Sequence, residues 1–279
     1  MCDIHDFSNP ELVEWIRRIF PHDAARFGPR FPRGVEYRKH WEVAMTARGL
    51  EAGGALRPDA ELLGVGAGNE PTIFWLTTMA HRVFATDLYM APGWEESANS
   101  SMLTDPGLHW SGSWNARRLV VQHMDALDLH YEDGSFDGIF SSSSIEHFGG
   151  HEDVRRAVDE MHRVLRPGGT LALATEIRLA GPSPGMAGTQ LFSAAELLEL
   201  VVGDRDWELI DQLQADVCAT TSAGATSFSA ALADLAAHVA EHGRLDYETL
   251  RWSRYPHVVL EHGAHRWTSV HLCLRRRTA

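Results

Sequence analysis

The stretch Glu61-Leu-Leu-Gly-Val-Gly-Ala-Gly-Asn-Glu70 decides the fold of this chain. A short apolar run gives way to closely spaced glycines and then to a helix-like segment at residues 72–79, which predicts a strand, a tight turn and a helix. Gly66 and Gly68 have no Cβ, so the backbone can bend sharply there and a ligand can lie against it. The free N–H groups of the following helix face the same place. A tight turn that binds nothing would use the same glycines.

A second apolar run, His81-Arg-Val-Phe-Ala-Thr-Asp87, ends in an acid 21 residues after Gly66. In a βαβ unit this spacing brings a carboxylate beside the glycine turn, where it can accept hydrogen bonds from both ribose hydroxyls of a nucleoside. A dinucleotide fingerprint needs a further glycine, but Pro71 and Asn69 stand at the corresponding positions counted from Gly66 and Gly64. The pattern therefore predicts an adenosine-type ligand and disfavours a pyrophosphate cradle.

Four later segments continue the pattern in a characteristic order and spacing. They are Val121–Ala126, Phe136–His147, Glu160–Gly169 and Thr170–Glu176. Together with the first two strands, they make residues 60–176 resemble the class-I-type S-adenosylmethionine-dependent methyltransferases, and Arg-Val-Leu-Arg-Pro-Gly-Gly at residues 163–169 is a specific match. The resemblance implies an α/β fold with a Rossmann-like, seven-stranded, mostly parallel sheet, helices on both faces and an N-terminal helical cap. It also implies S-adenosyl-L-methionine as the cofactor.

The resemblance also implies two sets of site residues. Cofactor contacts are expected from the glycine turn, from the residues that end or follow the next three strands, and from two lid residues in an N-terminal helix. In sequence order these residues are Tyr37, Trp41, Gly66, Ala67, Gly68, Glu70, Asp87, Leu88, Asp125, Ala126, Ser141 and Ser142. Glu146 and His147, which are expected to open the next helix beside the transferable methyl group, are the candidate catalytic residues.

One departure from the family pattern concerns the methionine end of the cofactor. The family usually has acid-x-Gly-x-Gly-x-Gly, and with Gly66 as the first glycine, Gly64 takes the place of the acid and Glu70 that of the third glycine. A second register puts Gly64, Gly66 and Gly68 on the three glycines and leaves Leu62 at the place of the acid. We prefer the first register. In both, the acid that helps orient the methionine end is missing, and we expect Glu70 or an N-terminal residue to replace it.

His147 is the candidate general base for methyl transfer. Its unperturbed pKa of about 6.5 would let it take a proton from an acceptor hydroxyl or amine around neutrality. Alternatively, Glu146 and His147 only cap the helix and pack, because transfer to a good nucleophile can proceed through proximity and orientation. His147 and His151 are spaced for one helix face, but Gly149-Gly150 interrupts that helix, so we expect no metal site.

The expected domain organisation is an N-terminal helical cap or lid at residues 1–58 and a Rossmann-like methyltransferase domain at residues 59–279. Apolar residues recur at helical spacing in two segments of the cap. Tyr37 and Trp41 lie in the second of these segments and are the lid candidates. The alternative for both residues is ordinary packing.

Two inserts are expected in the methyltransferase domain. The first, at about 89–118, is longer than one crossover helix requires and carries Trp94, Trp110 and Trp114. It either shapes an acceptor pocket or packs against the domain. The second insert, at about 212–262, is expected to bind the substrate or to make a dimer contact.

Composition places the chain among soluble globular proteins. Apolar residues make up 44% and charged residues 23% of its 279 residues. Three scattered cysteines, and the lack of both a leader sequence and a run of about 18 apolar residues, predict a reducing, cytoplasmic setting with no membrane. A formal charge of −13 disfavours nucleic acid as the acceptor, because binding to phosphates rests on Lys and Arg.

These expectations combine into one predicted function. The chain would transfer a methyl group from S-adenosylmethionine to an oxygen, nitrogen or carbon nucleophile of a small molecule or peptide-like metabolite. No nucleic acid and no membrane are expected as partners, and a homodimer is possible. Two alternatives stay open, namely a methyltransferase that acts on a macromolecule and a non-catalytic regulatory protein that binds S-adenosylmethionine.

Overall fold

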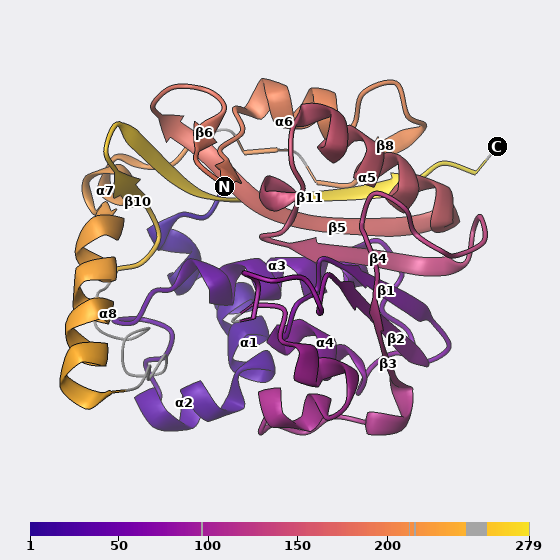
Figure 1. The fold of residues 1–279 in the computed structure, drawn as a ribbon, viewed down its shortest axis with the longest axis horizontal. Helices are drawn as coiled ribbons and strands as arrows, with labels where there is room; N and C mark the ends of the chain where they lie inside the picture. Colours follow the sequence, from indigo (N-terminus) through magenta and orange to yellow (C-terminus); the bar gives the residue numbers. More distant parts are fainter. Residues whose placement is uncertain (96, 212, 215, 244–255, 279) are drawn as a thin grey trace. The chain divides into compact units, whose positions relative to one another are not determined.

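The computed structural model describes residues 1–95, 97–211, 213–214, 216–243 and 256–278, and Figure 1 labels most of its helices and strands. The helices are α1 (Pro10–Ile19), α2 (Pro21–Phe27), α3 (Arg38–Ala52), α4 (Pro71–Leu76), α5 (His151–Val164), α6 (Ala194–Val201), α7 (Ala219–Ala223) and α8 (Phe228–His242). The strands are β1 (Glu61–Val65), β2 (Arg82–Asp87), β3 (Leu119–His123), β4 (Phe136–Ser142), β5 (Leu165–Ala180), β6 (Gly185–Met186), β7 (Thr189–Gln190), β8 (Trp207–Leu209), β9 (Thr226–Ser227), β10 (Leu260–His262) and β11 (His265–Arg276). Short 3₁₀ turns are η1 (Ile4–Ser8), η2 (Ser100–Leu103), η3 (Pro106–His109), η4 (Ala116–Arg118) and η5 (Ile145–His147).

The chain forms two compact units. The first unit comprises Met1–Trp41, Glu176–Ala194 and Gln214–Val270. The second unit comprises Glu42–Thr175, Ala195–Leu213 and His271–Ala279. Four elements, α3, β5, α6 and β11, continue from one unit into the other. The division into a cap and a sheet domain at residue 58 stays a prediction.

The large sheet has nine strands among the described residues, in the order β3-β2-β1-β4-β5-β11-β10-β9, with β8 also paired to β11, so the predicted count of seven is exceeded by two. All of them except β9 and β10 lie wholly or partly in the second unit. The strands from β3 to β5 pair in parallel, and β8 is antiparallel to β11. Figure 1 shows α5 and α6 on one side of these strands and α4 on the other. The predicted Rossmann-like, mostly parallel sheet with helices on both faces is confirmed.

Small residues let the end of α3 lie close to this sheet. A Cβ on Gly53 would be 2.1 Å from Thr170 Oγ1 of β5, and one on Gly138 of β4 would be 2.8 Å from Ala55 Cβ. Because the two segments lie so close together, the Thr170 hydroxyl donates a hydrogen bond of 2.9 Å to the Gly53 carbonyl oxygen. This packing places the second half of α3 directly against the central strands.

Asp137 joins the start of β4 to the start of β1. Its side chain is 8% exposed. Its Oδ2 accepts a hydrogen bond from the Glu61 N–H at 2.8 Å, and its Oδ1 accepts from Arg57 and Arg166, each at 2.7 Å. Burial by itself would raise the pKa of Asp137, but the bonds from Glu61, Arg166 and Arg57 hold that pKa below its usual value.

Acid should therefore weaken the fold through Asp137. A carboxyl group whose pKa is lower in the folded chain stabilises the fold above its unfolded pKa, and this contribution is lost as the pH falls through the folded pKa. At pH 7, Asp137→Asn should lower the free energy of unfolding by about 1–2 kcal/mol, because an N–H donor loses its acceptor. Urea unfolding from about pH 7 to pH 3 measures this. A difference between wild type and variant that does not shrink on acidification would contradict the prediction.

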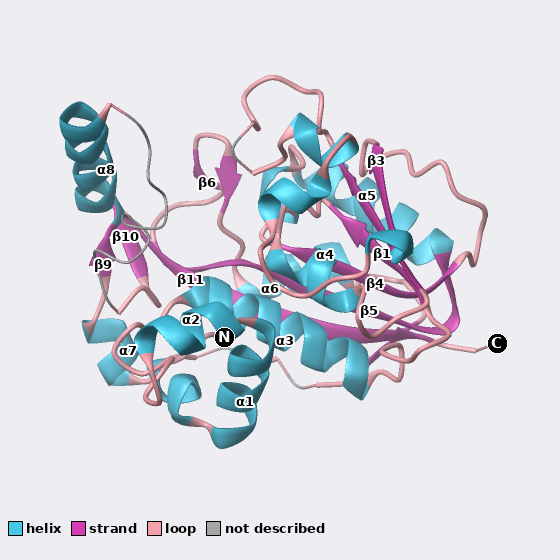
Figure 2. Cartoon of the chain, turned by 90° about the horizontal axis from the view of Figure 1, so that it is seen from below, coloured by secondary structure: helices cyan, strands magenta, loops and turns pink. Residues whose placement is uncertain are grey.

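In the first unit, β10 pairs antiparallel with the first residues of β11 and parallel with β9. Figure 2 shows α7, α8, β9 and β10 as neighbours along the chain and in space. Leu191, Leu260 and Trp267 form a buried cluster, against which Met186 and Phe228 pack. The expected insert at 212–262 contributes α7, β9, α8 and β10. Its residues 212, 215 and 244–255 lie outside the described part. Along the described residues, no helix is both long and apolar enough to cross a membrane.

Candidate active site

The glycine turn connects β1 to α4 and accommodates only glycine at two positions. Gly66 (φ +62°) and Gly68 (φ +53°) both lie in the left-handed region. A Cβ on Gly66 would be 2.6 Å from Ser144 Cβ, and one on Gly68 would be 2.2 Å from the Ser97 carbonyl oxygen. The turn is thus packed closely by two other loops, which explains why both positions require glycine.

The surroundings of Gly64 bear on the register of the glycine motif. Gly64 lies inside β1, and a Cβ there would be 2.5 Å from Phe140 Cζ of β4. Positions 64, 66 and 68 therefore all require glycine, which favours the second register over the one that we preferred from the sequence. Leu62, at the place of the acid in this register, is fully buried. Neither position 62 nor position 64 of β1 supplies a carboxylate.

Asp87 ends β2 and binds the glycine turn directly. Its Oδ2 accepts a hydrogen bond from the Gly68 N–H at 2.7 Å, and its Oδ1 accepts from the Leu88 N–H at 2.6 Å. Burial raises the pKa of Asp87 above its usual value, although the two N–H donors and His123 act in the opposite direction. Each carboxylate oxygen keeps a further lone pair. Asp87 can therefore also accept from two ribose hydroxyls, and this role stays a prediction.

The insert after β2 folds back over the glycine turn. The Tyr89 hydroxyl donates a hydrogen bond of 2.7 Å to the Gly68 carbonyl oxygen, and burial raises the pKa of Tyr89. The Asn69 N–H donates to the Ser97 carbonyl oxygen at 3.0 Å. Glu70, next along the chain, is the half-buried N-cap residue of α4. The insert is therefore bonded to the glycine turn at two points.

The three tryptophans of the insert have different neighbours. Trp110 stacks on Phe74 of α4 with ring centroids 6.0 Å apart, and Trp114 meets the same ring edge-on at 5.4 Å. The Trp94 ring lies 5.3 Å from the His147 ring and is 37% exposed. The packing interpretation therefore holds for two of the three residues, and the acceptor pocket stays a prediction. Trp110 and Trp114 pack the insert onto the domain, whereas Trp94 stands beside the candidate base.

Asp125 and Ala126 follow β3 at the same edge of the sheet. The Met124 N–H donates to the Asp87 carbonyl oxygen at 3.0 Å, which joins the ends of β2 and β3. Asp125 is exposed, and its Oδ1 accepts from the Leu127 N–H at 2.9 Å. Ala126 is buried. The two residues thus lie next to Asp87, and their contact with adenine stays a prediction.

The serines at residues 141–144 link the C-terminal end of β4 to α3 and to the glycine turn. Ser141 is fully buried inside the strand. The side-chain bonds of the other three run from Ser142 to the Thr46 hydroxyl (3.0 Å), from Ser143 to Glu42 Oε2 (2.7 Å) and from Ser144 to the Gly66 carbonyl oxygen (2.5 Å). Among the described residues, Ser143 is the only non-glycine residue with a positive φ, at +50°. The loop after β4 is therefore fixed beside the turn.

Glu146 and His147 lie in the 3₁₀ turn η5, so the expectation that they open the next helix is wrong. The helix α5 begins only at His151. Its N-cap residue is Gly150, whose N–H donates to Asp153 Oδ2 at 2.8 Å. The glycine pair before α5 separates the turn from the helix, because it lets the chain change direction there. His147 and His151 consequently do not share a helix face.

The two candidate catalytic residues differ in exposure. Glu146 is 1% exposed, and its Oε2 accepts a hydrogen bond from the Thr175 hydroxyl of β5 at 2.7 Å. His147 is half-buried and faces the Trp94 ring. Because Glu146 is buried and bonded to β5, its surroundings favour a role in holding the turn η5 in place. His147 is the more accessible of the two for a proton transfer.

The two lid candidates belong to the first unit, whereas the residues described so far belong to the second. Trp41 is buried, and its indole N–H donates to Asp6 Oδ2 at 2.7 Å. The Tyr37 ring packs on His257 with ring centroids 5.0 Å apart. These contacts agree with the packing alternative, and the contact of both residues with the cofactor stays a prediction.

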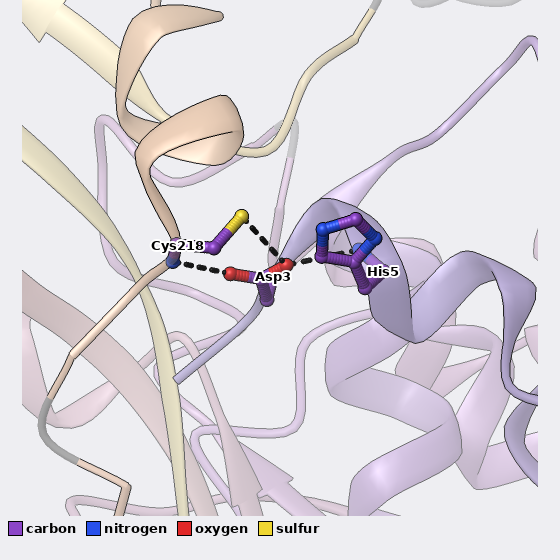
Figure 3. A group of neighbouring side chains, drawn as sticks. All are labelled: Asp3, His5 and Cys218. Carbon is purple, nitrogen blue, oxygen red and sulfur yellow. Dashed lines mark hydrogen bonds between the residues drawn. The ribbon is translucent and has the colours of Figure 1, made fainter.

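One group of metal-ligating side chains occurs in the described part of the chain. Asp3, His5 and Cys218, in the first unit, have ligand atoms within 4.8 Å of one another. Asp3 lies between the other two (Figure 3), with Oδ1 accepting from the His5 N–H at 2.9 Å and Oδ2 from the Cys218 N–H at 2.7 Å. The Cys218 thiol in turn caps α7 by accepting from the Thr221 N–H at 3.3 Å. Helix capping accounts for this arrangement.

Sequence reasoning missed three residues that the structure brings to the glycine turn or to the loop after β4. Ser144 continues a run of serines of which only two were selected, and Tyr89 lies two residues beyond Asp87. Both therefore had a signal in the sequence. Glu42 had almost none, because no motif spacing relates residue 42 to the loop after β4. The missing acid of the glycine motif predicted only that Glu70 or some N-terminal residue replaces it, without naming that N-terminal residue.

Comparison with known proteins identifies the stretch that carries this geometry. Residues 63–173 match the protein family described as "Methyltransferase domain". This stretch is a methyltransferase domain. The match begins inside β1, includes the glycine turn, Asp87, Asp125 and the serine loop, and ends inside β5. It confirms the family resemblance that the sequence motifs predict.

The methyltransferase domain has curated relatives that are themselves methyltransferases. The chain is 32% identical to 27-O-demethylrifamycin SV methyltransferase of Amycolatopsis mediterranei over 132 aligned residues. The alignment covers 46% of this chain and 43% of that protein. The chain is also 31% identical to an O-methyltransferase of Pyrenophora dematioidea over 185 aligned residues. This alignment covers 61% of this chain and 64% of that protein. The chain spans about half the length of the curated relatives that it matches first.

Solved structures extend the likeness of the fold beyond the methyltransferase domain. The [4+2]-cyclase SpnF superposes with a TM-score of 0.58 at 21% identity and covers 96% of both chains. A sarcosine dimethylglycine methyltransferase from Galdieria sulphuraria superposes with a TM-score of 0.56 at 18% identity and covers 86% of this chain and 85% of that chain. At these identities the likeness shows a shared fold.

Proposed function

We propose that the chain is an S-adenosylmethionine-dependent methyltransferase that modifies an oxygen, nitrogen or carbon nucleophile of a small molecule. The observation that carries the proposal is the bond from the Gly68 N–H to Asp87 at the end of β2, beside a turn that has no room for a Cβ. This arrangement suits a nucleoside with free ribose hydroxyls. The acceptor class is supported by the curated relatives, one of which is described as methylating 27-O-demethylrifamycin SV.

The described residues fit the cofactor, because Asp87 brings a carboxylate for the ribose to a turn of bare glycine backbone. Asp87 would bind the ribose, Asp125 and Ala126 would flank the adenine, and the serine loop would line the methionine portion. When bound, the cofactor supplies a methyl group on a sulfonium, which is an electron-poor carbon. The protein's part is to hold the acceptor in line with that carbon and to exclude water.

His147 is the proposed general base, and it would take the proton of the acceptor as the new bond to the methyl carbon forms. The half-buried position of His147 beside Trp94 supports this role, since the imidazole stays accessible while an aromatic ring shields one side. Glu146, bonded to Thr175, would hold the turn that carries His147. The dependence of kcat on pH in His147→Gln tests this assignment.

The remaining parts of the proposal concern the setting of the protein. The formal charge of −13 supports an acceptor other than nucleic acid. The chain has only three cysteines, and Cys218 and Cys273 are in no disulfide, which supports a reducing, cytoplasmic location. A lid role for residues 1–58 and a homodimer contact through residues 212–262 complete the proposal.

Thermal unfolding with added ligand tests the proposed cofactor. S-adenosylmethionine or S-adenosylhomocysteine at about 100 times its dissociation constant should raise the free energy of unfolding by roughly 2.7 kcal/mol, which is a rise of several degrees in Tm. NAD serves as the control and should cause no rise, because the turn lacks the dinucleotide pattern. Folded protein that responds to none of the three ligands would contradict the proposed function.

A further inference from the structure

S-adenosylmethionine carries a positively charged α-ammonium group at its methionine end. A binding site has to offer this group hydrogen-bond acceptors, and a carboxylate forms the strongest such bond because both partners are charged. Leu62 and Gly64 stand at the two β1 positions where the family pattern places an acid. A carboxylate for the ammonium group therefore has to come from another element.

Glu42 of α3 brings a buried carboxylate to the loop after β4. Glu42 is 1% exposed, and its Oε2 accepts a hydrogen bond of 2.7 Å from the Ser143 hydroxyl. The next residue, Ser144, donates from its hydroxyl to the Gly66 carbonyl oxygen at 2.5 Å. Two adjacent serines thus connect the Glu42 carboxylate to the glycine turn, and all four residues belong to the second unit.

The packing of α3 holds this carboxylate in place. Thr46 lies one helical turn after Glu42 on the same helix face, and its hydroxyl is 3.0 Å from that of Ser142. Farther along, Gly53 accepts the hydrogen bond from Thr170 of β5. Because Thr46 of α3 and Gly53, directly after the helix, are bonded to β4 and β5, the carboxylate does not have to be ordered when a ligand arrives, which favours affinity.

The backbone of Ser143 points to a ligand as well. Its φ of +50° is in the left-handed region, which costs a residue with a Cβ about 1–2 kcal/mol. Such conformations concentrate at ligand clamps, where the surrounding structure enforces them. Ser143 lies just beyond the C-terminal end of a central parallel strand, the edge at which sheets of this kind bind their ligands.

From these contacts we infer that Glu42 binds the α-ammonium group of S-adenosylmethionine, with Ser143 as the positioning residue for its carboxylate. The inference rests on the proposed function. A carboxylate buried in this way attracts a cation strongly, because the low dielectric of its surroundings weakens screening. Glu42 thereby takes the task of the acid that the first strand lacks, and Glu70 does not.

Calorimetric titration with two ligands tests the inference. One ligand is S-adenosylhomocysteine, and the other is its desamino analogue, which lacks only the ammonium group. Wild-type protein should bind S-adenosylhomocysteine about 10–100 times more tightly, as expected for a hydrogen bond between charged groups. Glu42→Gln should lose most of this factor for S-adenosylhomocysteine, while its affinity for the desamino analogue should stay within about twofold.

Two further variants separate the binding role from a structural one. Glu160→Gln removes a carboxylate of the same unit that is bonded to Arg163 and to the Leu129 N–H, and it should leave the preference for the ammonium ligand intact. Ser143→Ala should reduce the preference part of the way, because it frees the carboxylate without removing it. Ser143→Ala also keeps the inference testable if Glu42→Gln does not fold.

Three outcomes would overturn the inference. The first is an equal loss of affinity for both ligands in Glu42→Gln, which would mean that Glu42 only supports the loop. The second is a wild-type protein that binds both ligands equally, and the third is a preference left intact by Ser143→Ala and by Glu42→Gln. Folded wild-type protein that binds neither ligand would instead remove the proposed function, and the inference with it.

Discussion

Asp87→Asn should weaken the binding of S-adenosylhomocysteine about 100-fold. The two ribose hydroxyls are expected to donate to the two oxygens of this carboxylate, and hydrogen bonds to a charged group contribute about 1.5–3 kcal/mol each. An amide keeps the shape of the side chain but has no charge and only one acceptor. A combined loss of about 2.7 kcal/mol corresponds to the stated factor. Calorimetric titration measures it directly.

The stability of ligand-free Asp87→Asn should change much less than its affinity. Burial raises the pKa of Asp87, so the ionised carboxylate opposes folding at pH values above that pKa, and removing the charge relieves this cost. Against this gain, the N–H of Gly68 or Leu88 loses its acceptor. Asp128→Asn, which changes an exposed acid of the same unit, is the charge control. Unchanged affinity in Asp87→Asn would contradict the assignment of Asp87 to the ribose.

Gly68→Ala should lower the free energy of unfolding by about 2–4 kcal/mol. Part of the cost is conformational, because a residue with a Cβ at φ +53° costs about 1–2 kcal/mol. The rest is steric, since the new Cβ would be 2.2 Å from the Ser97 carbonyl oxygen, which is backbone and can move only with the insert. Moving the insert also breaks the bond from the Asn69 N–H to Ser97. Urea unfolding gives the size of the effect.

Gly54→Ala separates the two contributions. Gly54 has φ +80°, in the same region as Gly68, but a Cβ there would meet nothing within 4 Å. Gly54→Ala should therefore show the conformational cost alone. Gly68→Ala should exceed it by about 1–2 kcal/mol and should also weaken cofactor binding. Equal effects of the two substitutions would mean that the insert does not press on the turn.

Local motifs explain which parts of the fold were predictable. The strand, glycine turn and acid near residues 61–87 lie in one βαβ unit, whose geometry is set by spacing along the chain, so Gly66, Gly68 and Asp87 could be placed from the sequence. The apolar runs that end at Ser142 and begin near Thr170 are buried on both faces, which is typical of central parallel strands. These features led to the correct fold class.

The incorrect or incomplete expectations concern residues whose conformation or contacts depend on segments distant in the sequence. The spacing of the acid in the family favoured Gly66 as the first glycine, but the ring of Phe140 packs against Gly64 and makes that position a glycine as well. A helix was expected from Glu146, yet the chain forms one 3₁₀ turn before α5. The role of each tryptophan in the insert depended on whether it met Phe74 or His147, which no local pattern reports.

The sequence by itself determined the order of the strands from β1 to β5, the glycine turn and the acid at the end of β2, because these depend on residues close together in the chain. Only the tertiary structure decided that Glu42 meets Ser143 and that Ser144 meets Gly66. These pairs are separated by 101 and 78 residues, and each depends on how α3, β1 and β4 pack. Contacts of this kind follow from burial and close packing, which act across the whole core.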